Sequence, residues 1–307
     1  MQFRSPTRID FGGGWTDVPP FCDRECGFVC NAAINRYSVA TVERGAAQPT
    51  GRDDALIAAA LRRSGLTDVR ISVKSDFPVG AGLGGSSAAS AAILGALAEW
   101  RGEAIDRCEI AEAGRRIEVE DLGIAGGRQD HYAATHGGAL GLTFTTAVDV
   151  QRIELSDVTR AELERRALVI YTGQSRISGD TITAVIGAYL ERDRRVCVAL
   201  REMKRVAGEM AVALGKGDID WLAELVKEHW SSQRALSSAI PTPLIDEIIA
   251  TAAKAGALGA KALGASGGGC VLVIAGAESV EAVRRAVEPL GEMLPYALDF
   301  EGLSRVD

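Results

Sequence analysis

Residues 78–89 read Pro-Val-Gly-Ala-Gly-Leu-Gly-Gly-Ser-Ser-Ala-Ala, and this stretch decides how the rest of the chain is interpreted. Its four glycines leave the backbone without Cβ atoms where a ligand would approach closely. Two serines follow, and the apolar run from Ala88 to Ala98 predicts a helix that starts beside them. Because a helix N-terminus presents free N–H groups and a positive dipole end, the loop is a candidate phosphate site.

A glycine-rich loop of this kind also occurs in three different settings. Its glycines match the G-x-G-x-x-G motif of dinucleotide-binding enzymes, but no second strand follows the helix near residues 101–106, as that fold requires. A Walker loop needs a Gly-Lys pair, and no lysine occurs between Lys74 and Lys204. An ordinary Gly/Ser turn that caps a core helix stays open on this loop alone.

The composition limits the possible functions. The 307 residues are 47% hydrophobic and 24% charged, with a net charge of -7, which is ordinary for a globular protein. The dispersed arginines do not indicate a nucleic-acid surface, and no apolar run indicates a transmembrane helix or a signal peptide. The six cysteines contain no C-x-x-C pair. We therefore expect a cytoplasmic protein with reduced thiols and neither a nucleic-acid nor a membrane partner.

The order of predicted elements indicates an α+β fold in two halves. Strands are predicted over residues 28–34 and 37–42, separated by a short turn, and helices follow them in the first half. The second half alternates helices and strands and ends with a strand predicted over residues 297–300. We accordingly predict one domain over residues 1–165 and a second over residues 166–307.

Two further glycine-rich segments accompany the first. Residues 5–17 read Ser-Pro-Thr-Arg-Ile-Asp-Phe-Gly-Gly-Gly-Trp-Thr-Asp, and residues 261–270 read Lys-Ala-Leu-Gly-Ala-Ser-Gly-Gly-Gly-Cys. Such segments at the start, middle and end of one chain need a common reason. Convergence of the three loops on one ligand is the simplest.

Together the three loops resemble the GHMP kinase family, which includes galactokinase, homoserine kinase, mevalonate kinase and phosphomevalonate kinase. That family carries P-x-R/K near the N-terminus, then a P-x-x-x-G-L-G-S-S-A-like motif, then a late G-A-G-G-G-G-like loop. All three occur here in that order, and the resemblance covers nearly the whole chain. Within the family, residues 10–17 and 121–130 look most like the bacterial D-glycero-D-manno-heptose 7-phosphate kinases, with the L-fucose kinases next.

The resemblance implies both a fold and an activity. The fold would pair a ribosomal-S5-like N-terminal domain with a ferredoxin-like C-terminal domain, with the active site in the cleft between them. The activity would be ATP- and Mg²⁺-dependent phosphorylation of a sugar hydroxyl, most simply the anomeric one of a heptose 7-phosphate, to give the 1,7-bisphosphate. Fucose, galactose or another monosaccharide is the alternative acceptor. A non-catalytic sugar or nucleotide sensor on the same fold is the alternative of another class, and a homodimer is compatible with either.

Phosphoryl transfer needs a wrapped triphosphate, a metal ion and a positioned acceptor. By resemblance, the residues expected to bind ATP are Pro78, Gly80, Gly82, Leu83, Gly84, Gly85, Ser86, Ser87 and Ala88. Ser87 and Glu118 are the expected Mg²⁺ ligands, since Mg²⁺ prefers oxygen ligands. Glu120 is the alternative to Glu118, because the two point to different helix faces and only one can serve. A plain N-cap role is the alternative for the serines.

The resemblance assigns catalysis to Asp130, which would accept the proton of the sugar hydroxyl or orient that hydroxyl. Otherwise Asp130 is a common turn residue. Arg8 would stabilise charge on the transferring phosphoryl group, and its alternative is a surface ion pair with Asp10 or Asp17. His131, which adjoins Asp130, is expected to be structural.

Several residues are expected at the sugar. Asp17 would accept hydrogen bonds from hydroxyls, and Trp15 would pack on a C–H face, with core packing as its alternative. Arg176 and Lys261 would meet an anionic substituent such as a 7-phosphate. The full expected set is Gly13, Gly14, Trp15, Asp17, Asp130, Arg176, Lys261, Gly267 and Gly268.

The sequence departs from the family in two places. Gly85 stands where many members have Ser or Thr, which removes one hydroxyl. Residues 43–68 form a short segment compared with the heptose kinases, in a region that the family uses to help hold the nucleotide base. The nucleotide preference is therefore open.

Overall fold

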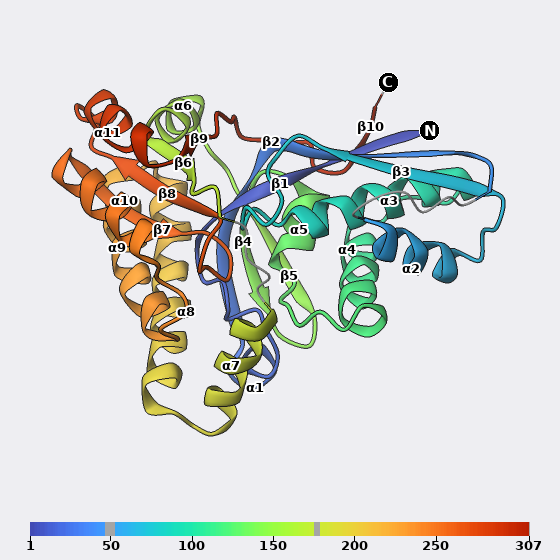
Figure 1. Ribbon diagram of the computed structural model, residues 1–307, viewed down its shortest axis with the longest axis horizontal. Helices are drawn as coiled ribbons and strands as arrows, with labels where there is room; N and C mark the ends of the chain where they lie inside the picture. The colour runs from blue at the N-terminus through green and yellow to red at the C-terminus, as the bar shows by residue number, and fades with distance from the viewer. Residues whose placement is uncertain (47–52, 175–178, 307) are drawn as a thin grey trace.

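The computed structural model describes residues 1–46, 53–174 and 179–306, and it places their strands in two antiparallel sheets flanked by helices (Figure 1). The first sheet has the order β10-β1-β2-β4-β5, with β3 also paired to β2. Its strands are β1 (Gln2–Gly12), β2 (Gly27–Arg44), β3 (Val69–Ser75), β4 (Ala139–Phe144), β5 (Val148–Ile153) and β10 (Ser304–Arg305). The second sheet has the order β7-β8-β6-β9. Its strands are β6 (Ala167–Tyr171), β7 (Ala257–Ala262), β8 (Cys270–Ala275) and β9 (Glu292–Met293).

Helices cover both sheets. In the first half they are α1 (Phe21–Glu25), α2 (Asp54–Ser64), α3 (Gly85–Arg101), α4 (Arg107–Arg116), the π-helical η1 (Ile117–Asp121), α5 (Gln129–His136) and α6 (Asp157–Arg166). In the second half they are α7 (Gly179–Leu190), α8 (Arg194–Lys216), α9 (Ile219–Ala235), α10 (Pro243–Lys254), α11 (Val280–Val287) and the 3₁₀ turn η2 (Glu288–Leu290). Asp193, Asp218 and Thr242 begin α8, α9 and α10, because each side chain accepts a hydrogen bond from a first-turn N–H. Among the described residues, no helix is long and apolar enough to cross a membrane.

The long strand β2 replaces two predicted strands. The prediction of separate strands over 28–34 and 37–42 is wrong, because both segments pair with β1 and belong to one continuous strand. The register shifts between Pro6 and Thr7 of β1, which leaves Asn35 and Arg36 unpaired opposite them. These two residues form a bulge rather than a turn.

Beyond that shift, β1 separates its two faces by simple alternation. Ile9 and Phe11 are fully buried on one face, whereas Arg8 and Asp10 line a cavity on the other. Because Ile9 and Phe11 are held in the core, the side chains of Arg8 and Asp10 must point to the opposite face, towards the cavity.

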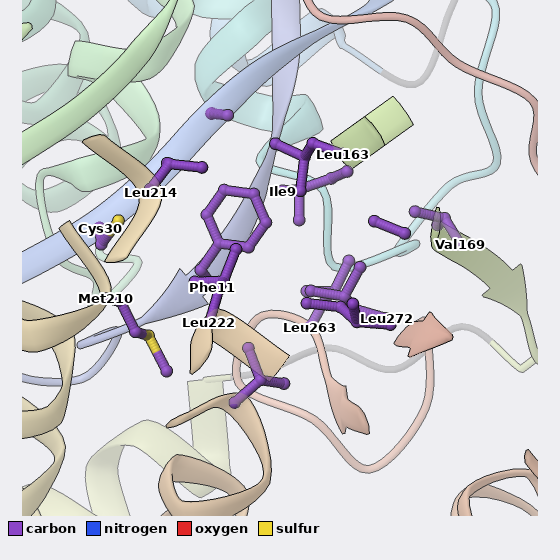
Figure 2. Packing of buried hydrophobic residues seen from close by; sticks show 14 of the residues in the cluster. Ile9, Phe11, Cys30, Leu163, Val169, Met210, Leu214, Leu222, Leu263 and Leu272 are labelled. Carbon is purple, nitrogen blue, oxygen red and sulfur yellow. The ribbon is translucent and has the colours of Figure 1, made fainter. Parts of the chain in front are cut away.

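The core below Phe11 is shared by the two sheets (Figure 2). Phe11 lies with Met210 of α8, Leu222 of α9 and Leu272 of β8 in one buried cluster. Because residues from both halves of the chain fill the same core, the end of β1 is held against the second half by ordinary apolar packing.

The end of the chain returns to the first sheet. The predicted strand over 297–300 is wrong: Leu298 makes one isolated bridge to Ile34, and the Asp299 carboxylate then accepts hydrogen bonds from two following N–H groups, which turns the chain. After this turn, β10 pairs with β1. The last strand of the chain therefore belongs to the first sheet, although it lies in the predicted second domain. The division of the chain into domains after residue 165 stays a prediction.

Candidate active site

A cavity of about 320 Å³ lies between the two halves of the chain, within the range of small-molecule sites. The first half contributes the loop after β1, the glycine loop before α3, and the segment from η1 into α5. The second half contributes Ile182, Gly264 and Ala265. All three glycine-rich segments therefore reach one cavity.

The glycine loop before α3 has the backbone that its sequence suggests. Gly80, Gly82 and Gly84 have φ angles of 66°, 73° and 75°, in the left-handed region that favours glycine. Helix α3 begins directly afterwards at Gly85. Its N-terminus therefore faces the cavity with free N–H groups, which suits an anion.

The third loop packs directly on the second. A Cβ on Gly82 would lie 2.7 Å from the carbonyl oxygen of Leu263, so the two backbones approach too closely for a side chain. The N–H of Cys270 also donates to the carbonyl oxygen of Ala81 at 2.8 Å. The convergence of these two loops, expected from their composition, is therefore observed as direct backbone contact.

The structure gives a steric explanation for the glycine at position 85, where many members of the family have Ser or Thr. A Cβ at this position would lie 2.4 Å from Cε2 of the Phe77 ring, and both residues line the cavity. Phe77 thus occupies the space that a serine side chain would need. The departure from the family motif is matched by a neighbouring aromatic residue.

Arg8 joins the glycine loop to Asp130. Its Nε and Nη2 lie 2.8 and 2.6 Å from Asp130 Oδ1, and its Nη1 donates to the carbonyl oxygen of Gly82 at 2.6 Å. Asp130 lies in the first turn of α5 and packs over Gly84, since a Cβ there would meet its Cγ at 3.1 Å. Arg8 is 3% exposed, so it is not the surface ion pair that was its alternative.

Glu118 and the two serines form an oxygen-rich corner of the cavity. The hydroxyl of Ser86 donates to Glu118 Oε1 at 2.5 Å, and Ser86, Ser87 and Glu118 all line the cavity. Glu120 instead pairs with Arg63 on the surface, with 56% of its side chain exposed. Of the two candidate metal ligands, only Glu118 reaches the cavity.

His131 supports Glu118 from behind. Its Nε2 lies 3.2 Å from Glu118 Oε2, and both side chains are buried. Burial raises the pKa of Glu118, but the charge of His131 and the serine hydroxyls outweigh it and hold that pKa below its ordinary value. Burial likewise lowers the pKa of His131, and Glu118 more than reverses this. The two therefore form a buried ion pair.

Asp17 caps the helix that carries Asp130. Its Oδ2 accepts hydrogen bonds from the N–H groups of Arg128 at 2.8 Å and Gln129 at 3.0 Å. Gly127 permits this approach, because a Cβ there would lie 1.8 Å from the same oxygen. Burial raises the pKa of Asp17 to about 6, with a further contribution from the charge of Asp130, although the two N–H groups oppose the shift.

Two more residues offer acceptors beside Asp17. Asp10 Oδ1 and Gln129 Oε1 are buried, and neither has a hydrogen-bond partner among the described residues. Both residues line the cavity. Trp15 lines it too, while belonging to a buried apolar cluster, so its core packing is observed and its contact with a sugar stays a prediction. Buried acceptors of this kind require a donor, and the hydroxyls of a sugar are suitable donors.

Several expected site residues lie elsewhere. Lys261 is fully buried and pairs with Asp10 at 3.1 Å, so it does not line the cavity and its charge is already compensated. The described lining also lacks Gly13, Ala88, Gly267 and Gly268. Arg176 lies outside the described residues. The expectation of direct contact with a substrate anion therefore has no support at Lys261.

The sequence interpretation also missed residues of the cavity wall. Asp10, Phe77 and Gln129 line the cavity, as do Ile124 to Gly127. The alternation of charged and apolar residues from Arg8 to Phe11 would have located Asp10. Nothing in the local sequence identifies the remaining residues, because they reach the cavity through tertiary packing.

Two family descriptions match the chain. Residues 52–138 match the GHMP kinases N terminal domain, and residues 210–290 match the GHMP kinases C terminal domain. Together they account for more than half of the chain, which confirms the predicted fold class.

Individual relatives of the chain include sugar kinases. The chain is 30% identical over 298 residues to the D-glycero-alpha-D-manno-heptose 7-phosphate kinase of Campylobacter jejuni, covering 88% of this chain and 87% of that one. It is 26% identical to the bifunctional fucokinase/GDP-fucose pyrophosphorylase of Arabidopsis thaliana, covering 94% of this chain but only 31% of that protein. The crystal structure of a D-glycero-D-manno-heptose 1-phosphate kinase from Bacteroides thetaiotaomicron superposes with a TM-score of 0.77 at 25% identity, covering 100% of this chain and 99% of that one.

Proposed function

The chain belongs to the GHMP kinase family and is an ATP-dependent sugar kinase, and on this premise we propose that it phosphorylates the anomeric hydroxyl of a heptose 7-phosphate. One observation carries the assignment of the reaction centre. Arg8 contacts both Asp130 and the backbone of the glycine loop, so the proposed base and the proposed phosphate site are held within one hydrogen-bonded unit.

We infer one task for each residue of this unit. The N–H groups at the start of α3 hold the phosphate chain. The Asp130 carboxylate accepts the proton of the sugar hydroxyl as the hydroxyl oxygen attacks the γ-phosphorus of ATP, and the bond from that phosphorus to the β,γ-bridging oxygen breaks. Arg8 compensates the charge that develops on the transferring group, because its guanidinium lies between Asp130 and the loop. The products are the sugar 1-phosphate and ADP.

We also propose that the enzyme uses Mg²⁺, because the oxygen atoms at one corner of the cavity suit this ion. The Ser86 and Ser87 hydroxyls and the Glu118 carboxylate supply only oxygen atoms, which is what Mg²⁺ prefers. Among the described residues no group of three or more His, Cys, Asp or Glu side chains is placed to hold a metal, so the remaining ligands would be phosphate oxygens and water. When bound, Mg²⁺ neutralises negative charge on the phosphates.

The choice of acceptor is the finer part of the proposal. The relative from Campylobacter jejuni is a heptose 7-phosphate kinase, which favours a sugar phosphate. A neutral sugar is the second candidate, and the charges of the cavity favour it. Among the described lining residues Arg8 is the only cation, and it already pairs with Asp130. A 7-phosphate would therefore need a cation from outside them, and Arg176 is the candidate that the sequence offers.

The experiment is a substrate panel. Purified protein is mixed with ATP, Mg²⁺ and, in turn, D-glycero-D-manno-heptose 7-phosphate, L-fucose, D-galactose and D-mannose, and ADP release is measured. The proposal expects the highest kcat/KM with the heptose 7-phosphate and a marked loss of that preference in Arg176→Gln. Higher kcat/KM with a neutral sugar would transfer the assignment to the second candidate. Binding of ATP with no stimulated ADP release would favour the sensor.

Two further expectations concern the cellular location and the oligomeric state of the protein. A cytoplasmic location and a homodimeric assembly both stay predictions. Size-exclusion chromatography with light scattering distinguishes a homodimer from a monomer.

A further inference from the structure

The loop that follows β1, defined here as residues 12–17, is strained. Trp15 has a φ angle of 81°, which L side chains other than Asn and Asp rarely adopt, whereas the φ angle of 90° at Gly13 is one that glycine adopts readily. Gly14, Trp15 and Asp17 of this loop line the cavity. Strain of this kind persists only where neighbours hold the conformation.

The first half of the chain supplies only part of what holds the loop. The hydroxyl of Thr16 donates to the carbonyl oxygens of Gly13 at 2.7 Å and Phe28 at 3.0 Å. The N–H of Thr16 also donates to the carbonyl oxygen of Gly13, which closes the turn. These bonds fix the shape of the turn and tie it to β2, while Asp17 at the end of the loop is tied to the start of α5.

The second half supplies two buried polar side chains, His229 and Lys261. The N–H of Gly13 donates to Nε2 of His229 on α9 at 2.8 Å. Nζ of Lys261 on β7 donates to the carbonyl oxygen of Asp10 at 3.0 Å and lies 3.1 Å from Asp10 Oδ2. Both side chains have no exposed surface, and neither lines the cavity. They touch the chain immediately before and within the loop.

The protonation states fit these contacts. Burial lowers the pKa of His229 to about 3, with the charge of Lys261 contributing, so its ring is neutral and Nε2 is free to accept. The Asp10 carboxylate lies against Lys261, so neither charge is left unpaired in the core.

We propose that Lys261 and His229 are positioning residues for sugar binding, which act from the second half of the chain by fixing Asp10 and the turn at Gly13. The proposal rests on the sugar-kinase function but on none of its finer assignments. It replaces the expected direct contact of Lys261 with a substrate anion by an indirect role.

His229 gives the sharper test because it has a matched pair of substitutions. His229→Leu removes the acceptor from the Gly13 N–H, whereas His229→Gln retains an amide oxygen in nearly the same place. Loss of one buried hydrogen bond corresponds to roughly a tenfold change in an equilibrium constant. We expect His229→Leu to raise the KM for the sugar about tenfold with little change in the KM for ATP, and His229→Gln to recover most of that loss.

Tyr296→Phe is the matched control. The Tyr296 hydroxyl donates to the carbonyl oxygen of Ala167 at 2.8 Å, also in the second half, but it touches neither the loop nor the cavity. This variant is expected to lower the thermal midpoint without moving the sugar KM. If His229→Leu behaves like Tyr296→Phe, His229 is merely structural and the proposal is wrong.

Lys261 is tested by a charge-neutral double variant. Lys261→Met alone leaves Asp10 as an unpaired buried charge and is expected to fold poorly. Asp10→Asn combined with Lys261→Met removes both charges and is expected to fold, with a raised sugar KM. An unchanged sugar KM in the folded double variant would contradict the role of this pair.

A second measurement does not depend on turnover. Hydrogen–deuterium exchange of the peptide that spans residues 12–17 is expected to be faster in His229→Leu than in the wild type and in His229→Gln. If the wild type phosphorylates no sugar, the proposed function fails, while this exchange still decides whether His229 holds the loop. Equal exchange in all three proteins would overturn the positioning role.

Discussion

The proposed phosphate-binding loop at residues 80–87 and the proposed sugar loop at residues 12–17 meet in one cavity but are held in different ways. The first depends on backbone: glycines with positive φ and the N–H groups of α3. The second depends on side chains whose partners are distant in sequence, such as His229, which is 216 residues from Gly13. We therefore propose that backbone geometry serves the ATP phosphates, whereas side chains from both halves of the chain shape the sugar site.

The largest expected effect comes from substitution of Asp130, which lies in the cavity that both loops line. Asp130→Asn preserves the shape of the side chain and removes the proton acceptor, so kcat should fall by about two to four orders of magnitude. ATP affinity should be retained, because the variant leaves the glycine loop intact. Steady-state kinetics and titration calorimetry with ATP check both statements, and an unchanged kcat would remove Asp130 from the role of base.

A backbone change in the proposed phosphate-binding loop should affect ATP binding more than sugar binding. Gly82→Ala places a Cβ 2.7 Å from the Leu263 carbonyl oxygen at a φ of 73°, which costs roughly 1–3 kcal/mol. We expect ATP affinity to fall by about tenfold or more, with sugar binding less affected. Gly65→Ala is the matched control, since Gly65 has a φ of 69° but nothing within 4 Å of its Cβ position. Equal ATP affinities in the two variants would contradict a backbone-built phosphate loop.

The sugar loop should instead respond to pH through Asp17. Its pKa is raised to about 6 by burial, so protonation below that pH removes a hydroxyl acceptor. The kcat/KM for the sugar should fall by about tenfold per pH unit on the acid side of this value. The KM for ATP should not follow it. A pH profile from 4.5 to 8 with no acid limb near 6 would contradict the role of Asp17.

Stability should move in the opposite direction over the same range. The folded-state pKa of Asp17 lies above the value of about 3.9 expected when unfolded, so the native state binds the proton first as pH falls. The cost of burying the ionised carboxylate is therefore fully present above pH 6 and is relieved as pH falls towards 4. Relative to Asp17→Asn, the wild type should gain thermal stability between pH 6 and 4.

The smallest expected effect concerns Gly85. Gly85→Ser restores the usual residue of the family but drives its Cβ to 2.4 Å from the Phe77 ring. We expect a loss of about 1–3 kcal/mol in the free energy of unfolding and only a few-fold change in the KM for ATP. Phe77→Leu in the same chain should recover much of the stability. If Gly85→Ser alone is as stable as the wild type, the steric role of Phe77 at this glycine is wrong.

The same contrast explains what the sequence could predict. Residues 80–87 form their loop and helix start through local glycine chemistry, so their place at the cavity was predictable. The direct role expected for Lys261 was not supported, because a charged residue in a motif gives no sign that Asp10, 251 residues away, will pair with it. The bulge at Asn35 and the ring of Phe77 against Gly85 likewise follow from pairing and packing between segments.

The most direct test of the proposed reaction identifies its product. Phosphorus NMR of a reaction containing ATP, Mg²⁺ and D-glycero-D-manno-heptose 7-phosphate should show the γ-phosphate signal of ATP replaced by a second sugar-phosphate signal, coupled to the anomeric proton, in equal amount to the ADP formed. Release of inorganic phosphate alone, or a new phosphate on any other carbon, would contradict the proposed reaction.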